Sequence, residues 1–461
     1  MNQMLHPKPV SNTRTRIVAA TLGLGAFLTQ FDVTSVIMAM PAIGRDLDLG
    51  VAGLTWVVDS YSLAFTVALL AAGALTDRFG RRRALLMGNM VFLLASIACG
   101  LARNGLELWA ARAAQGIGAA FVITAAIASI AAIFPSPQAR ARAFGIVGVM
   151  SGISMALGPT LGAVISSGIG WRWIFFANLP FCVLIAIAVP RLIVEAREER
   201  GRSIDWPSVA VLALALGFAI EAFLTARESL LYLVAGLAVA AMLFAVFIRL
   251  QRRQPIPLFD PTLFRSRPMA AAAILLIAMS IGYWALLVYL PMFFGAALGW
   301  SGEMAGLGML ILTLPMLVIP PVAARLGDAL GWRYLFSAAL AAMALGGMVL
   351  AVAALTADAS LIMIETVIGM LMIGTGAAVA HPQLSGIIVA LAPADAAGMA
   401  SAITVVARQG GFAIGVAMLG AAMPSEQTAS GFAGVFAIAA AASALGAAAC
   451  VLLPHDTKAQ P

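Results

Sequence analysis

The stretch GALTDRFGRRRALL, residues 73–86, places four arginines and one aspartate between two long apolar segments. Each of these segments is close to the roughly 20 residues that cross a bilayer as a helix. A short, arginine-rich loop between two such helices is typical of the cytoplasmic face of a membrane protein. Of the 461 residues, 62% are hydrophobic and 10% are charged, whereas soluble domains carry about 25% charged residues. The sequence therefore predicts an all-α polytopic membrane protein.

Outward from this loop, apolar segments of spanning length recur along the whole chain. Loops and termini rich in arginine or lysine alternate with connections that carry few of them, as expected when successive segments cross the membrane in opposite directions. We therefore predict 14 transmembrane helices. They are expected near 17–40, 51–75, 84–102, 107–133, 140–168, 173–190, 205–225, 230–248, 269–295, 303–325, 334–355, 360–391, 397–422 and 431–453.

The basic residues orient these helices. With the amino terminus inside, 21 lysines and arginines lie on the inner side and only 4 on the outer side. The positive-inside rule then places both termini in the cytoplasm of a multi-pass protein in a bacterial inner (plasma) membrane. Because this asymmetry explains the net charge of +7, the basic composition does not indicate a nucleic-acid partner.

The longest charged connections divide the chain into three parts. We expect an amino-terminal six-helix bundle over residues 1–202, a two-helix insert over 203–253 and a carboxy-terminal six-helix bundle over 254–461. Segments 73–83 and 324–334 align, each joining the second and third helices of its bundle. The aligned pairs are Asp77 with Asp328, Gly80 with Gly331 and Arg82 with Arg333. Duplicated halves around a central substrate site are a transporter architecture.

Several classes of function are not supported by the residues. Lysine occurs only at Lys8 and Lys458, so the chain has no phosphate-binding GxxxxGK loop and no nucleotide is expected. Three cysteines without CxxC spacing indicate neither a disulfide framework nor a metal site. No catalytic constellation or soluble output domain is present, so we expect no cofactor and no enzyme. The expected partners are a small-molecule substrate, protons and the lipid bilayer, with the chain acting as a monomer.

The opening stretch resembles the signature loop of the major facilitator superfamily, Gly-x-Leu-x-Asp-Arg-x-Gly-Arg-Arg. The resemblance implies a loop that holds one face of a transporter closed. Glycine permits close helix approach, while the aspartate and arginines can form charge-assisted bonds to a neighbouring helix end. The matching residues are Gly73, Asp77, Arg78, Gly80, Arg81 and Arg82.

Further stretches resemble the fourteen-helix drug/proton antiporter branch of that superfamily. LWAARAAQGIGAAF (108–121) is similar to its fourth-helix motif, and AGMASAITVVARQGGFAIGVAMLGA (397–421) also fits this branch. GISMALGPTLGAVI (152–165) resembles the antiporter motif of the fifth helix, although Ser154 and Ala163 replace usual glycines. The matching residues are Gly158, Pro159 and Gly162. We interpret the Gly-Pro pair as a bend or hinge, because proline removes a backbone hydrogen bond within the span.

Three charges within predicted spans share one layer. From the helix rise of about 1.5 Å per residue, Asp32 and Asp59 each lie about 12 Å below the outer boundary, and Arg112 lies roughly 8–10 Å below it. Such residues face the bundle interior or a water-filled cavity. We predict that Asp32 and Asp59 carry the proton or the positive charge of the substrate and that Arg112 modulates them. The alternative is a static buried ion pair that only fixes packing.

The carboxy-terminal half offers a second set of candidates. Arg408 lies within a predicted span, and Glu365 is its candidate partner. Aromatic residues that could line an adaptable substrate cavity by cation–π contact are Phe31, Trp56, Tyr283, Trp284 and Tyr289. The alternative for aromatic residues near helix ends is a role as membrane-interface anchors.

These features together predict a transporter that exports amphipathic, cationic drugs or toxic compounds by alternating access in exchange for protons. Acidic residues within the spans favour cations, and the resemblance implies antiport. A specific exporter or importer of an endogenous metabolite or a single antibiotic is the alternative, and a membrane enzyme or sensor is a remote one.

Overall fold

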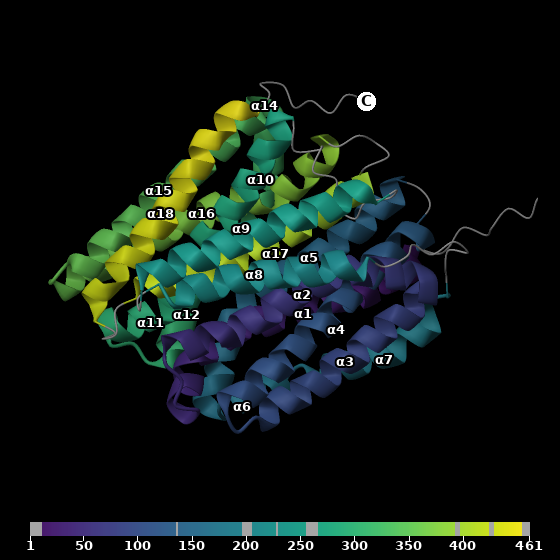
Figure 1. Ribbon diagram of the computed structural model, residues 1–461, viewed down its shortest axis with the longest axis horizontal. Helices are drawn as coiled ribbons and strands as arrows, with labels where there is room; N and C mark the ends of the chain where they lie inside the picture. The colour runs from purple at the N-terminus through teal and green to yellow at the C-terminus, as the bar shows by residue number, and fades with distance from the viewer. Residues whose placement is uncertain are drawn as a thin grey trace, which may run out of the picture.

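The computed structural model describes residues 12–134, 137–195, 205–226, 229–254, 266–391, 397–423 and 428–453, and within these ranges the secondary structure is entirely helical. Figure 1 shows two inclined groups of long helices that diverge toward one end of the molecule. The first group comprises α1 (Asn12–Asp46), α2 (Val51–Phe79), α3 (Arg81–Leu101), α4 (Gly105–Ile133), α5 (Pro137–Gly168), α6 (Arg172–Phe176) and α7 (Leu179–Leu192).

The remaining helices form a lateral hairpin and the second group. The hairpin consists of α8 (Trp206–Leu224) and α9 (Leu230–Arg253). The second group comprises α10 (Arg267–Met279), the π-helix η2 (Ser280–Ala285), α11 (Leu286–Leu298), α12 (Gly302–Thr313), α13 (Pro315–Val318), α14 (Pro320–Leu330), α15 (Trp332–Leu355), α16 (Ala359–Leu391), α17 (Ala397–Ala422), η4 (Ala429–Gly431), α18 (Phe432–Ala449) and η5 (Cys450–Leu452).

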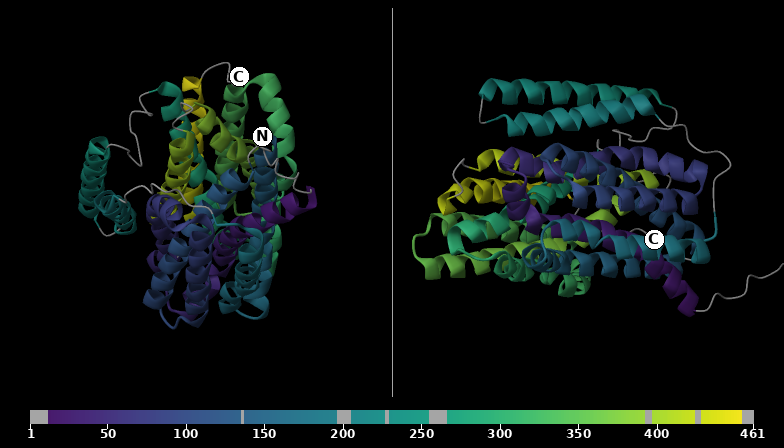
Figure 2. Two further views of the ribbon diagram at one scale, coloured as in Figure 1. Left: turned by 90° about the vertical axis from the view of Figure 1, so that its right-hand side faces the viewer. Right: turned by 90° about the horizontal axis from the view of Figure 1, so that it is seen from below.

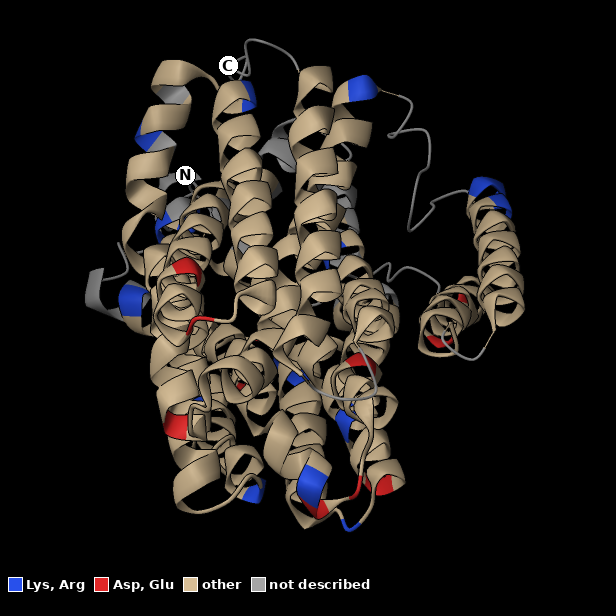
Figure 3. Cartoon of the chain, turned by 90° about the vertical axis from the view of Figure 1, so that its left-hand side faces the viewer, with Lys and Arg blue, Asp and Glu red and all other residues tan. Residues whose placement is uncertain are grey.

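Each of the fourteen predicted segments coincides with a helix or a run of consecutive helices. Within the described residues, twelve helices are long and apolar enough to cross a membrane. The pair Gly302–Val318 and Pro320–Gly327, bent by 42°, raises the number to thirteen if it forms one span. α17 is not among these spans, so the count of fourteen stays a prediction. Figure 3 shows the charged residues mainly toward the ends of the helices, as a bilayer requires.

The predicted internal repeat appears in the backbone at its aligned glycines. Gly80 ends α2 and begins α3 with φ of 101°, and Gly331 stands between α14 and α15 with φ of 86°. Only glycine adopts such φ values without steric cost, so both tight connections require it. The two halves therefore turn in the same way at corresponding places.

The α8–α9 hairpin lies along one side of the molecule (Figure 2). Its α8 packs through Ile220 against Ala413 and Ala417 of α17, and Trp56 of α2 joins the same apolar cluster. A second cluster joins Val209 and Leu212 of α8 to Phe247 of α9, with Val67 of α2 against it. The hairpin thus covers the seam between α2 and α17. The three-part division of the chain stays a prediction, and its first boundary, at 202–203, lies outside the described residues.

The fifth-helix motif packs directly on α1. A Cβ at Gly158 would lie 1.9 Å from the Thr34 hydroxyl oxygen, and a Cβ at Gly162 would lie 2.5 Å from the Ser35 backbone oxygen. The Ser35 hydroxyl donates to the Gly158 carbonyl at 3.1 Å. Small residues therefore allow these two backbones to approach closely. α5 continues as one helix through Pro159.

The two departures from the antiporter motif fit this packing. Ser154 is buried, and its hydroxyl donates to the Phe27 carbonyl of α1 at 2.7 Å. Ala163 faces α12, because a Cβ at Gly306 would lie 2.2 Å from the Ala163 Cβ. The motif therefore also joins the two halves, together with a hydrogen bond from the Thr160 hydroxyl to the Gly306 carbonyl at 2.9 Å.

Replacement of Gly162 by alanine is expected to destabilise the protein by about 1–3 kcal/mol, because the added methyl group overlaps the α1 backbone. Gly145, on the same helix, has no other atom within 4 Å of a built Cβ, so Gly145→Ala is the matched control. The midpoint of thermal unfolding of purified protein measures both changes. Equal midpoints for the two variants would contradict the tight α1–α5 contact.

Candidate functional site

A buried ion pair joins α1 to α4. The carboxylate of Asp32 and the guanidinium of Arg112 are in direct contact through a charge-assisted hydrogen bond, and both side chains have 1% exposure or less. The other Asp32 oxygen accepts hydrogen bonds from the side-chain amides of Gln115 at 3.1 Å and Asn178 at 2.8 Å. Asp32 and Arg112, which were predicted to lie in one layer, are therefore in direct contact.

The rest of the Arg112 guanidinium is also occupied. Its Nε donates to the Val57 carbonyl of α2 at 3.0 Å, and its Nη1 donates to the Gln115 side chain at 2.8 Å. Its Cζ lies 4.4 Å from the centre of the Tyr61 ring, a cation–π contact. The Gln115 amide also donates to the Ser96 hydroxyl of α3 at 2.8 Å. This network joins α1, α2, α3 and α4 and has the form of a static packing element.

Asp59 does not join this network. Its side chain is fully buried, and neither carboxylate oxygen has a hydrogen-bond partner among the described residues. One turn away on α2, the Thr55 hydroxyl lies 3.2 Å from a built Cβ at Gly420 of α17. Residues four apart share a helix face, so Asp59 lies on the side of α2 that faces α17. The predicted trio is thus split into a pair and a single acid at the seam between the halves.

A cavity of about 400 Å³ lies between the two halves, within the range of small-molecule sites. Among the described residues that line it, Arg408 is the single Arg or Lys, and neither Asp nor Glu is present. The lining residues are Leu22, Ala26, Thr29, Gln30, Val33, Tyr61, Phe65, Ile123, Ala126, Ile127, Ile130, Phe144, Val147, Gly148, Ser151, Met155, Trp284, His381, Arg408, Gln409 and Phe412.

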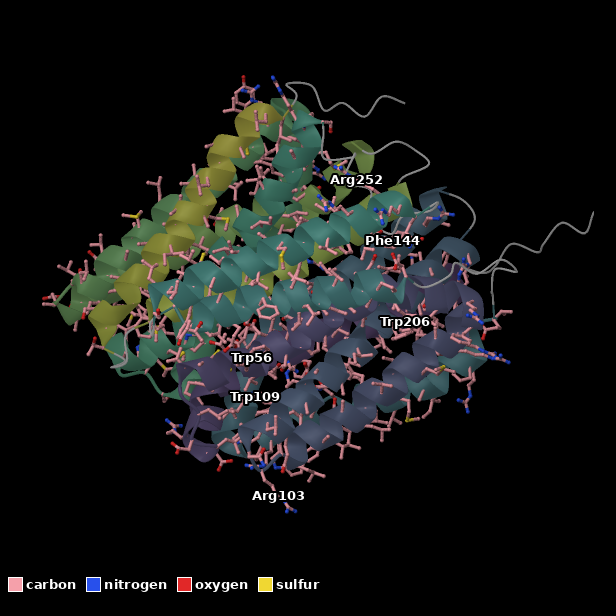
Figure 4. The ribbon with its side chains drawn as sticks, viewed as in Figure 1. Trp56, Arg103, Trp109, Phe144, Trp206 and Arg252 are labelled. Atoms are coloured by element: carbon pink, nitrogen blue, oxygen red, sulfur yellow. The ribbon has the colours of Figure 1, made fainter. Side chains whose placement is uncertain are left out.

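The lining residues identify which end of the molecule the cavity occupies. In Figure 4, Phe144 lies toward the end that carries Arg252, and Arg103 lies at the opposite end. By the predicted topology, Arg252 is cytoplasmic and Arg103 is external. At the Arg103 end, apolar residues of both halves form one continuous core that includes Ile43 of α1 and Phe293 of α11. The molecule is therefore closed at the Arg103 end, with its cavity toward the other.

Of the five aromatic residues predicted to line the cavity, Trp284 does so. The others are not among its lining residues. Phe31 stacks on Phe27 with ring centres 5.9 Å apart, and Trp56 belongs to the cluster beneath α8. Tyr283 is buried edge-on against Trp284, and the Tyr289 hydroxyl donates to the Val416 carbonyl at 2.6 Å. For these four residues, a position in a substrate cavity stays a prediction.

The predicted pairing of Arg408 with Glu365 is not formed in the structure. Glu365 accepts a hydrogen bond from the Thr356 hydroxyl at 2.8 Å, near the loop between α15 and α16. Arg408 points instead into the cavity, beside His381 and Gln409. Sequence reasoning did not assign these two neighbours to a cavity. The sequence features that could have identified them are that His381 precedes Pro382 within a span and that Gln409 follows Arg408.

The arginine-rich loop is held by an acid that sequence reasoning missed. Glu195, which follows α7, accepts hydrogen bonds from the backbone N–H groups of Arg82 at 3.1 Å and Arg83 at 3.2 Å. Its carboxylate also lies 3.9 Å from the Nε atoms of both arginines. An acid at this position satisfies the free N–H groups of the α3 amino terminus and interacts with its dipole. The sequence feature that could have identified Glu195 is its position in a charged connection predicted to lie on the same, cytoplasmic side of the membrane as the arginines.

The other loop residues contribute less than the motif suggests. A Cβ at Gly73 would meet no atom within 4 Å, so the expected close helix approach at this glycine was wrong. Arg78 is exposed, with its guanidinium 5.8 Å from the centre of the Phe79 ring, and Arg81 opens α3. The side chain of Asp77 lies outside the described residues.

Comparison with known proteins identifies the family to which this site belongs. The sequence profile of the Major Facilitator Superfamily matches residues 22–416 and 272–461. The chain belongs to the major facilitator superfamily. It is 32% identical over 417 residues to the multidrug resistance protein Stp of Mycobacterium tuberculosis, covering 90% of this chain and 76% of Stp. The tetracenomycin C resistance and export protein of Streptomyces glaucescens is 31% identical, covering 91% and 78% of the two chains.

Solved structures agree with this membership at the level of the fold. A peptide transporter, POT, has a TM-score of 0.71 at 15% identity, covering 98% of this chain and 95% of the transporter. A D-xylose–proton symporter has a TM-score of 0.69 at 16% identity, covering 96% and 99%. This major facilitator protein is thus a multi-pass membrane transporter for small molecules, and its similar proteins include drug efflux and multidrug resistance proteins.

Removal of one member of the buried pair is expected to be more damaging than removal of both charges. Arg112→Gln leaves the Asp32 carboxylate uncompensated and should lower stability by about 3–5 kcal/mol. The double variant Asp32→Asn/Arg112→Gln should recover part of that loss, because no unpaired charge remains. Thermal unfolding in lipid nanodiscs of the unmodified protein, Asp32→Asn, Arg112→Gln and the double variant measures the coupling. Strict additivity of the two substitutions would contradict an energetic pair.

Proposed function

We propose that this protein exports amphipathic compounds from the bacterial cytoplasm in exchange for protons. Two features support the proposal: a cavity between two helical groups, and a buried acid at the seam between α2 and α17. Its similarity to Stp, and to the tetracenomycin C resistance and export protein, favours export of toxic compounds over uptake. Both termini would lie in the cytoplasm, as the distribution of basic residues predicts.

The arrangement of the two ends supports alternating access. The cavity lies toward the end that the topology assigns to the cytoplasm, while α5 and α12 pack together toward the opposite end through contacts such as the hydrogen bond from the Thr160 hydroxyl to the Gly306 carbonyl at 2.9 Å. Transport requires this contact to open while the other end closes. Rocking of two helical groups about a central site accomplishes both movements.

Asp59 is the observation that carries the proton-coupling proposal. An ionised carboxylate without a donor is costly to bury, and a bound proton removes that cost. Because α2 and α17 belong to different halves, movement of one against the other changes what surrounds this carboxyl group. Asp59 can then bind a proton in one state and release it in the other.

Asp32 and Arg112 have a different role in this proposal. Their network has donors and acceptors from four helices, so the charges are stable without proton exchange. Tyr61 lies against Arg112 and also lines the cavity. We propose that the pair holds α2 in place, so that Tyr61 and Asp59 keep their positions relative to the cavity.

The segment 73–83, which comprises the end of α2, Gly80 and the start of α3, is proposed to act as a latch at the inner end. Glu195 fixes the start of α3 to the chain that leaves α7, so this end of the first helical group moves as one body. The exposed Arg78 and the neighbouring arginines then present positive charge to the second helical group when this end closes. Asp77 and Gly80 are the remaining residues of the motif in this segment.

The test of coupling is proton-driven efflux in everted membrane vesicles. Asp59→Asn is expected to abolish accumulation of a fluorescent substrate driven by a pH gradient, while downhill movement of the same substrate persists, because the amide cannot carry a proton. Asp48→Asn is the matched control, since Asp48 is exposed in a loop and its φ of 52° suits asparagine.

The same vesicles give the decisive contrary result. Normal gradient-driven accumulation by Asp59→Asn, at expression equal to that of the unmodified protein, would exclude Asp59 as the proton site. Gradient-driven movement in the opposite direction would exclude export.

A further inference from the structure

The charged group among the described residues of the cavity is a cation, Arg408, and none of these residues supplies its counter-ion. Arg408 lies on α17, and among the described residues its guanidinium takes part in no hydrogen bond or ion pair. The lining residues that the structure describes include no carboxylate. A buried or half-buried arginine is ordinarily paired, because an unpaired charge in a low-dielectric site is costly. The missing partner is therefore to be sought among the molecules that enter the cavity.

Two further polar groups lack partners beside Arg408. The indole Nε1 of Trp284 and the Nε2 of His381 are buried without a hydrogen-bond partner within the described part of the chain. Both residues line the cavity, and their rings meet edge to face with centres 5.3 Å apart. The indole N–H is a donor only. Buried donors are satisfied in the great majority of proteins, so this group also points to a ligand that accepts hydrogen bonds.

The backbone holds Trp284 and Arg408 in a fixed relation. Trp284 belongs to the π-helix η2, a form that is frequent at functional sites. At the start of η2, the Ser280 hydroxyl donates to the Arg408 carbonyl at 2.9 Å. A Cβ at Gly411, one turn further along α17, would lie 3.2 Å from the Ser280 Cβ. The close packing of η2 on α17 therefore places both donor residues along one wall.

We propose that the cavity binds organic anions, with an aromatic or polycyclic body and a carboxylate that pairs with Arg408. Trp284 would donate a further hydrogen bond to the same acidic group. The wall formed by the first helical group is apolar and aromatic, with Phe65 and Phe144 available to cover the body of the ligand, and Phe412 lies one turn from Arg408 on α17. This inference rests on the proposed export function, because it names the class of substrate that enters this cavity.

The charges in the structure favour an anion over the cation that the sequence suggests. Asp32 is already neutralised by Arg112, and neither Asp32 nor Asp59 is among the lining residues. A cation in the cavity would be repelled by Arg408, most strongly where water is excluded. A carboxylate would instead form a charge-assisted and bidentate contact with the guanidinium.

Equilibrium binding to the purified full-length protein in nanodiscs tests this inference without requiring transport. The probes are 1-pyrenebutanoate and the neutral 1-pyrenebutanamide, which share their aromatic body and differ in the charged group. The unmodified protein should prefer the carboxylate. Arg408→Gln should weaken carboxylate binding by about 10- to 100-fold and leave amide binding unchanged, because only the charge-assisted contact is lost.

Two variants accompany the measurement. Arg408→Lys should recover part of the carboxylate affinity, because it keeps the charge but loses the bidentate geometry. Arg325→Gln is the matched control, since Arg325 is exposed on α14 and away from the cavity lining. If Arg408→Gln fails to fold, the preference of the unmodified protein between the two probes still decides the question.

Equal affinity for the two probes in the unmodified protein would overturn the inference, as would an unchanged carboxylate affinity in Arg408→Gln. The proposed function fails separately. Arg408-dependent binding of 1-pyrenebutanoate without gradient-driven export would overturn export and keep the anion site. Gradient-driven export of a cationic dye that is unaffected by Arg408→Gln would do the reverse.

Discussion

The requirement that buried charges be neutralised within the low-dielectric interior governs the central part of this structure. The Asp32–Arg112 pair meets the requirement inside the first helical group, where Gln115, Asn178 and the Val57 carbonyl occupy the remaining donors and acceptors. A network that draws on so many helices fixes their relative positions. Because Asp32 and Arg112 neutralise each other, neither is expected to exchange protons or to bind a charged ligand. The described residues provide no partner for the charged groups of Asp59 and Arg408.

Those two groups stand in different places for a physical reason. Asp59 faces the seam between α2 and α17, so its surroundings change when the halves move. Arg408 faces the cavity, so its surroundings change when a ligand enters. In a proton-coupled exporter these are the two events that must be linked. Both residues lie on the pair of helices whose seam the α8–α9 hairpin covers, so the hairpin is positioned to keep water from that seam.

Much of the fold followed from sequence because a bilayer imposes it. Helices must satisfy their own backbone within hydrocarbon, which is why every predicted apolar segment is helical in the structure. The aligned glycines of the two halves, Gly80 and Gly331, both adopt positive φ because their connections turn in the same way. Depth was also predictable, since the helix rise is constant, and it correctly brought Asp32 and Arg112 to one level.

The sequence by itself determined the helical class, the matching glycine turns of the two halves and the common level of Asp32 and Arg112, because these depend on hydropathy and on distance along one helix. It could not determine which side of a helix faces a cavity, a seam or a neighbouring bundle. That choice depends on how helices rotate and cross, and packing between residues distant in the sequence sets both. Only the tertiary structure therefore showed that Asp59 lies apart from the Asp32–Arg112 pair. It also placed Arg408 beside Trp284 and His381 and not beside Glu365. The other predicted aromatic residues, Phe31, Trp56, Tyr283 and Tyr289, are not among the residues that line this cavity.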